Sequence, residues 1–254
     1  ENIGATDLAD APLKNIAAVV STKGSSSSHV AILARALGIP AVMGADDLDL
    51  SRVDGHELIV DGYTGRLFFD PSSATRIEYS RRAEEEYLLT KELRSLRKLP
   101  AETPDGRRIP LYVNTGLTAD ITPSKKSGAE GVGLYRTEVP FMIRDRFPGE
   151  EEQRKIYQQT LKAFAPRPVT LRTLDIGGDK SLPYFPIHEE NPFLGWRGIR
   201  VTLDHREIFL TQVRAMIRAA IGLDNLNILL PMISDLGELD EAMLLIDQVF
   251  AELQ

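Results

Sequence analysis

The sequence has 254 residues and carries 30 Lys and Arg against 37 Asp and Glu, a formal net charge of −7. Cysteine is absent, which excludes disulfides and thiolate metal sites and fits the reducing conditions of the cytoplasm, where we expect the protein. The acidic balance argues against nucleic-acid binding, and no run approaches the roughly 18 apolar residues of a transmembrane helix. We therefore expect a globular protein that lies outside the membrane.

Residues 1–73 are expected to form a small α/β domain. Short apolar runs at 17–21, 41–45 and 57–62 predict strands, and 58–69 carry two Gly-containing turns that predict a hairpin. The segment SSSSHVAILARALGIP predicts a helix, because its apolar residues recur at spacings of three and four. Gly38 and Pro40 mark the end of that helix.

Residues 74–104 are expected to form a linker. The stretch 74–99 is rich in charge and contains neither Gly nor Pro, which predicts one long helix. Its apolar residues form a sloping stripe: Tyr79, Ala83, Tyr87, Leu89, Leu93 and Leu96. Pro100 and Pro104 end the helix, so a rigid connector is the natural interpretation.

Residues 105–254 alternate between strand and helix patterns. Strands are predicted at 111–116, 131–138, 169–175 and 227–233, with an irregular strand at 196–200, and helices at 150–165, 206–221 and 236–253. This alternation predicts a parallel sheet, with a (β/α)8 barrel as the leading fold. Four or five units do not close such a barrel, so the pattern alone leaves open half a barrel or an open sheet.

His29 is the candidate nucleophile. It follows a Gly-Ser turn at the start of a predicted helix, where free backbone N–H groups and the helix dipole favour an incoming phosphoryl group. The same field disfavours imidazolium and keeps a neutral ring nitrogen for attack. The same pattern is more often an ordinary exposed histidine behind a serine N-cap.

Three arginines lie at or just beyond predicted strand ends: Arg136, Arg172 and Arg197. The carboxyl ends of parallel strands face the active site in such folds, and guanidinium groups suit a ligand with carboxylate and phosphate. The alternative is that each arginine pairs with a neighbouring acid: Glu138, Asp175 or Glu190. The sequence DIGGDK, starting at Asp175, predicts a sharp loop beside them.

Taken together, these segments resemble Enzyme I, the phosphoenolpyruvate-protein phosphotransferase of the bacterial phosphotransferase system. The matching stretches are GSSSSHVAILARALGIPAVMG, EGVGLYRTE with PFM and FPGEEEQ, LRTLDIGGDKSLPYFPIHEENPFLGWRGIR, and ILLPMIS. They span nearly the whole chain in the order of the family. The proline in RTEVPFM resembles the nitrogen-regulatory branch more than the sugar branch.

The resemblance implies a fold and a set of roles. The fold is a phosphohistidine swivelling domain, a linker helix and the first half of a PEP-binding (β/α)8 barrel, so the chain is a fragment of a homodimeric parent. His29 would accept the phosphoryl group from PEP, Arg136 and Arg172 would hold PEP, and Arg197 would support them. The products would be pyruvate and a phosphohistidine that passes its group to an HPr-like carrier.

The resemblance also implies Mg²⁺, whose ligands we expect beyond the end of this chain, so we predict no metal ligand here and little activity from the chain alone. One departure is Ser25, which replaces a family glycine before His29. Two alternatives stay open: a pyruvate phosphate dikinase or PEP synthase, which share the histidine segment, and a regulatory phosphoacceptor or PEP-sensing module without turnover.

Overall fold

A computed structural model describes residues 12, 15–25, 28–46, 48, 53–142, 144–178, 182, 184–187, 190–191 and 194–253; for residues 29, 32, 33 and 36 the description is limited to the backbone. The chain divides into two compact units, Glu1–Leu99 and Pro100–Gln254. In the described part of the chain, no helix is both long and apolar enough to cross a membrane.

The first unit contains two small sheets. Strands β1 (Val19–Ser21) and β2 (Ala41–Met43) are parallel and are joined through helix α2 (His29–Ala36). Val19, Val30 and Ala34 form the core between α2 and these strands. Strands β3 (Leu58–Asp61) and β4 (Arg66–Phe69) form the predicted hairpin, with Asp61 opposite Arg66.

Helix α3 spans Ser73–Leu96 and begins behind Ser72, whose side chain accepts a hydrogen bond from the Thr75 amide. None of its 24 residues, all of which are described, is buried. The helix contacts the hairpin: the Tyr79 ring lies 5.1 Å from the Phe68 ring, and Glu86 accepts a hydrogen bond from the Tyr63 hydroxyl. The leucines of the predicted stripe, Leu89, Leu93 and Leu96, are each more than half exposed. The predicted long helix is therefore confirmed, and the leucines of its apolar stripe do not pack into a core.

The second unit contains a parallel sheet in chain order: β5 (Val113–Thr115), β6 (Val132–Tyr135), β7 (Val169–Arg172) and β8 (Leu226–Leu229). Its helices are α4 (Ile121–Lys126), preceded by the 3₁₀ turn η3 (Thr118–Asp120), α5 (Glu138–Met142), α6 (Glu150–Phe164), α7 (Ile199–Asp204), α8 (Arg206–Ala219) and α9 (Leu236–Glu252). The prediction of a mixed α/β fold with a parallel sheet is confirmed.

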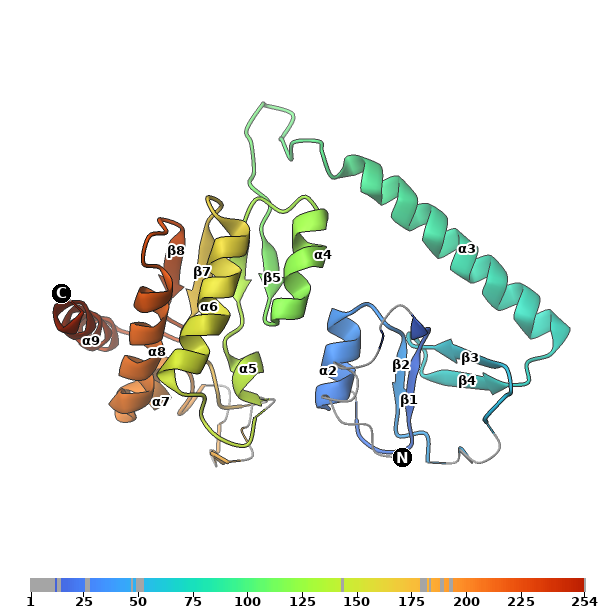
Figure 1. The fold of residues 1–254 in the computed structure, drawn as a ribbon, viewed down its shortest axis with the longest axis horizontal. Coiled ribbons are helices and arrows are strands. Elements are labelled where there is room, and N and C mark those ends of the chain that lie inside the picture. Colours follow the sequence, from blue (N-terminus) through green and yellow to red (C-terminus); the bar gives the residue numbers. More distant parts are fainter. Residues whose placement is uncertain are drawn as a thin grey trace. The chain divides into compact units, whose positions relative to one another are not determined.

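The main core lies between this sheet and helices α6 and α8, which run side by side along it (Figure 1). Tyr135, Leu161, Leu171 and Met216 are fully buried there. A second cluster joins α8 to α9. A third, built on Phe141, Leu174, Ile176, Leu182 and Val201, lies beyond the carboxyl end of β7. This third cluster supports the segments that carry the candidate site.

The predicted strand at 196–200 is wrong. No strand occurs there: Gly198 has φ +61° and ψ −123°, and α7 begins at Ile199. A side chain on Gly198 would lie 2.9 Å from the Met232 side chain, and the Gly198 amide donates to the Ile176 carbonyl. The chain therefore turns tightly past its neighbours at this point, and only glycine accepts both the left-handed backbone and the close approach.

Candidate functional site

Arg136 and Arg172 lie at the same edge of the second unit's sheet. Strands β6 and β7 are parallel neighbours, with Tyr135 opposite Leu171. Arg136 directly follows β6, and Arg172 is the last residue of β7. Both arginines therefore occupy the carboxyl edge of the sheet, where parallel α/β folds place their ligands.

One carboxylate joins Arg172 to Arg197. The Oδ2 atom of Asp175 lies 3.1 Å from Nη1 of Arg172, while Oδ1 accepts a hydrogen bond of 3.0 Å from Nε of Arg197. A second bond of 3.3 Å runs from Nη2 of Arg197 to Oδ2. Only 4% of the Asp175 side chain is exposed, against 13% of each guanidinium side chain. Asp175 thus gathers two arginines that the sequence separates by 25 positions.

A second buried carboxylate orients Arg172 from the other side. Glu138, the first residue of α5, accepts a 2.6 Å hydrogen bond at Oε1 from Nη2 of Arg172, and its side chain is 2% exposed. The neighbouring hydroxyl of Thr137 donates to the backbone carbonyl of Arg172. The acids expected as ordinary pairing partners are therefore present, but Asp175 links two arginines in one network instead of forming separate salt bridges.

Polar groups without a partner occur at the same place. Within the described part of the chain, the buried Nε of Arg172 and the buried hydroxyl of Thr173 have no hydrogen-bond partner. A buried polar group without a hydrogen-bond partner costs about 1–3 kcal/mol of stability. Unmet groups of this kind mark positions where water or a ligand is expected.

Arg136 differs from the other two arginines. Its backbone amide donates to the Thr115 carbonyl at 2.7 Å, which holds the segment after β6 against β5. Its side chain is exposed and makes no ion pair with any residue that the structure describes. A permanently charged guanidinium is thus available to solvent at the edge where Arg172 is held rigidly.

His29 begins α2 in the first unit, as the sequence predicts. The hydroxyl of Ser28 accepts a hydrogen bond of 3.4 Å from the Ala31 amide, so the serine N-cap is present. Gly24 has φ +92°, and an added side chain there would contact Ser28. The turn before His29 therefore takes its left-handed residue from Gly24 and not from position 25.

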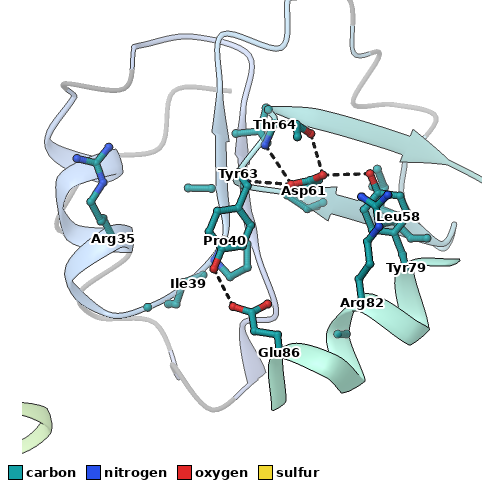
Figure 2. A pocket seen from close by; sticks show the side chains of 18 of the residues that line it. Arg35, Ile39, Pro40, Leu58, Asp61, Tyr63, Thr64, Tyr79, Arg82 and Glu86 are labelled. Atoms are coloured by element: carbon teal, nitrogen blue, oxygen red, sulfur yellow. Dashed lines mark hydrogen bonds between the residues drawn. The ribbon is translucent and has the colours of Figure 1, made fainter. Parts of the chain in front are cut away.

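A groove of about 1220 Å³ lies in the first unit between β2, the β3–β4 hairpin and α3 (Figure 2). Asp61 accepts hydrogen bonds there from the Thr64 hydroxyl (2.8 Å) and the Tyr79 hydroxyl (3.0 Å). The Tyr63 hydroxyl donates to Glu86 at 2.7 Å. These bonds fasten the hairpin turn to α3. The groove belongs to the first unit and the three arginines belong to the second.

The described residues do not fit a magnesium site. No three His, Asp or Glu side chains among them gather into a group that could hold a metal ion. The two buried acids beside Arg172 are Glu138 and Asp175, and each directs carboxylate oxygens to a guanidinium. The magnesium that the resemblance implies therefore finds no ligand set in this part of the chain.

Comparison with known families covers most of the chain. Residues 90–254 match the model of the PEP-utilising enzyme, PEP-binding domain, and residues 1–65 match that of the PEP-utilising enzyme, mobile domain. This chain belongs to the PEP-utilising enzymes. The mobile-domain match includes His29, and the PEP-binding match includes all three arginines.

Several relatives of this chain have names that agree with the resemblance to Enzyme I. It is 50% identical over 254 residues to an Escherichia coli protein named phosphoenolpyruvate-dependent phosphotransferase system. It is 40% and 39% identical to proteins of Staphylococcus carnosus and Haemophilus influenzae, both named phosphoenolpyruvate-protein phosphotransferase. The match covers 100%, 98% and 98% of this chain but 34%, 44% and 43% of the relatives. The resemblance to Enzyme I is confirmed, and the chain spans less than half of these relatives.

Some residues of the candidate site could not be assigned from the sequence. Glu138 and Asp175 were expected only as possible pairing partners, because sequence cannot show that Asp175 serves two arginines. Gln212, whose side chain accepts a hydrogen bond from the Leu174 amide beside Asp175, was not singled out at all. The 38 positions between Gln212 and Leu174 leave no local signal of their contact.

Proposed function

We propose that this chain supplies the phosphohistidine and PEP-binding parts of an enzyme that transfers a phosphoryl group from PEP to His29, and then to an HPr-like carrier protein, releasing pyruvate. The observation that carries the proposal is the sharing of Asp175 by Arg172 and Arg197 at the carboxyl edge of β7. Arg136 stands at the end of the adjacent strand. The proposal also draws on the names of the relatives.

The arginines suit the chemistry of PEP, which carries a carboxylate and a phosphate on one three-carbon unit. Guanidinium groups bind both anions through paired N–H bonds and keep their charge at any pH of interest. We assign Arg136 and Arg172 to PEP itself and Arg197 to a supporting role through Asp175. Because Arg172 is held by two carboxylates, it needs little reorganisation when the ligand arrives, which favours binding of PEP.

The transfer step uses the imidazole of His29. Its neutral Nε2 attacks phosphorus, the bond between phosphorus and the enol oxygen breaks, and the electron pair stays on that oxygen. Protonation of the resulting enolate at carbon yields pyruvate. The start of α2 suits this role because its free N–H groups favour a phosphoryl group and disfavour imidazolium before attack.

The proposed domains are a swivelling phosphohistidine domain at 1–73, a linker at 74–104 and half of a (β/α)8 barrel at 105–254. The four parallel strands in chain order, with helices between them, support the barrel half. A homodimeric parent in the cytoplasm and magnesium bound by residues outside the described part belong to the same proposal.

The experiment is phosphorylation of the full-length protein with PEP labelled at phosphorus, in the presence of Mg²⁺. We expect acid-labile label on the wild type, release of pyruvate in equal amount, and no label on His29→Ala. His56→Ala is the control, because His56 is an exposed residue paired with Asp70. Label on His29→Ala at the wild-type level would overturn the assignment, and a wild type that yields neither label nor pyruvate would instead indicate a phosphoacceptor that is not supplied by PEP.

A further inference from the structure

A chain of four buried hydrogen bonds runs through the second unit from the loop before α6 to the segment after β7. Gln153 donates from Nε2 to the Pro148 carbonyl at 2.8 Å, and Tyr157 donates its hydroxyl to Oε1 of Gln153 at 2.9 Å. Gln212 donates from Nε2 to the Tyr157 hydroxyl at 3.1 Å. The Leu174 amide donates to Oε1 of Gln212 at 2.7 Å.

The order of these bonds has one consistent direction. The Pro148 carbonyl can only accept and the Leu174 amide can only donate, so each side chain between them must present its oxygen on one side and its N–H or O–H on the other. The side chains of Gln153, Tyr157 and Gln212 are 3% exposed or less. Burial raises the pKa of the Tyr157 hydroxyl, which therefore remains a donor throughout the physiological pH range.

The far end of the chain meets the backbone where β7 stops pairing. The Thr173 amide still donates to the Leu229 carbonyl of β8, at 2.9 Å. Leu174 and Ile176 are fully buried but lie beyond the paired part of β7. The Leu174 amide donates its hydrogen bond to the Gln212 side chain. Loss of the hydrogen-bond partner of a buried amide destabilises the folded state. The position of this backbone segment therefore depends on the position of the Gln212 side chain.

The segment so held carries the carboxylate of the site. Leu174 lies between Arg172 and Asp175, and Asp175 is the residue that joins Arg172 to Arg197. A small displacement of this backbone moves a carboxylate that touches two guanidinium groups. Misplacement of binding groups by about 1 Å is enough to cost up to about a hundredfold in rate.

We infer that Gln212 is a positioning residue for the PEP site: its amide, oriented by Tyr157 and Gln153, fixes the Leu174 backbone and thereby sets the place of Asp175 between Arg172 and Arg197. This inference rests on the proposed function, since it assumes that these arginines serve PEP. It also gives the glutamine of the sequence FPGEEEQ a role, because Gln153 orients the network from outside the site.

The test combines amide hydrogen exchange with kinetics. In Gln212→Leu, exchange at the Leu174 amide should rise at least about tenfold relative to the adjacent Thr173 amide, whose partner is the Leu229 carbonyl. In the full-length protein, the KM for PEP should rise about tenfold, with kcat changed less than about threefold. Tyr157→Phe, a smaller change, should show the same pattern more weakly, because the Gln212 amide loses the bond that sets its orientation.

Asn225→Leu is the matched control. Asn225 is also a buried amide, which donates to the Leu161 and Arg167 carbonyls, but it precedes β8 at the opposite edge of the sheet. Asn225→Leu should lower Tm by about as much as Gln212→Leu does. It should leave both the ratio of Leu174 to Thr173 exchange and the KM for PEP within about twofold of the wild type.

Three outcomes would overturn the inference. The first is a KM for PEP within twofold of the wild type in Gln212→Leu and Tyr157→Phe despite faster Leu174 exchange. The second is an unchanged exchange ratio in both variants. The third is an equal rise in KM in Asn225→Leu, which would show that lost stability alone affects the site. A wild-type protein without PEP-dependent labelling would instead contradict the proposed function.

Discussion

Glu138 and Arg172 form a buried ion pair across 34 positions of the chain, with Oε1 and Nη2 2.6 Å apart. Glu138 begins α5 and Arg172 ends β7, so the pair joins a helix to the neighbouring strand. Desolvation opposes such a pair, and it is stable only with good geometry and further hydrogen bonds. Its position at the carboxyl edge of the sheet therefore indicates a held guanidinium and not a general stabilising contact.

Replacement of Asp175 with asparagine should affect stability and PEP binding together. Asp175→Asn keeps the shape but leaves two largely buried guanidinium groups without their shared charge. We expect the free energy of unfolding to fall by about 3 kcal/mol in urea titrations, and the KM for PEP in the full-length protein to rise at least about tenfold. Glu78→Gln, in an exposed pair on α3, should change the unfolding free energy far less than Asp175→Asn does. Equal effects of the two variants would contradict this view of Asp175.

Arg136 and Arg172 should separate binding from stability. Arg136→Ala removes an exposed side chain, so the unfolding free energy should change by less than about 0.5 kcal/mol. Loss of a charged hydrogen bond to the ligand should nevertheless weaken PEP binding by about 2 kcal/mol, some thirtyfold. Arg172→Ala should lower both the free energy of unfolding and the affinity for PEP. Calorimetric titration with PEP and thermal unfolding measure them, and unchanged PEP affinity in Arg136→Ala would remove this residue from the site.

Asp61 should make the stability of the first unit depend on pH. The Thr64 hydroxyl is the largest cause that lowers the pKa of this carboxyl, with further hydrogen bonds from the Thr64 and Tyr63 amides and the Tyr79 hydroxyl, while burial opposes the shift. Because the folded pKa lies below the unfolded value of about 3.9, the stabilisation is present above that pH and is lost as pH falls through the folded pKa.

The comparison with Asp61→Asn isolates this contribution. The difference in unfolding free energy between wild type and variant should be constant above about pH 5 and shrink as the pH falls below about 4. Urea titrations monitored by circular dichroism at several pH values measure it. A difference that grows on acidification would have the wrong sign for a carboxylate held in its charged form.

The helix caps should differ in their effect on the whole fold. Asp235 is the N-cap of α9 and accepts a 2.9 Å hydrogen bond from the Glu238 amide. Helix α9 buries Ala242, Leu245, Ile246 and Val249. Asp235→Ala should lower the unfolding free energy by about 1 kcal/mol. Ser72→Ala removes the corresponding cap of α3, a helix without buried residues, so cooperative unfolding should change by less than about 0.5 kcal/mol. Thermal unfolding compares the two, and a larger loss in Ser72→Ala would show that α3 is part of a cooperative core.

The sequence was sufficient wherever the determining signal is local. The hairpin turn at 61–65, the helix that starts at His29, the long helix 73–96 and the parallel strands all follow from turn residues and apolar periodicity over a few positions. The placement of Arg136 and Arg172 at strand ends follows in the same way. The motif from Asp175 onward and the histidine segment also carry the family resemblance, and the chain is 50% identical over its whole length to a relative of that family.

Only the tertiary structure decided how distant residues meet. Asp175 proves to be shared by Arg172 and Arg197, the segment before Ile199 is a tight turn and not a strand, and the leucines of α3 face no core. Gln212 reaches the Leu174 amide through packing of α8 against the sheet. Periodicity reports which residues prefer burial, but the partner of a buried charge or amide depends on distances across the fold, and those exist only once the chain has packed.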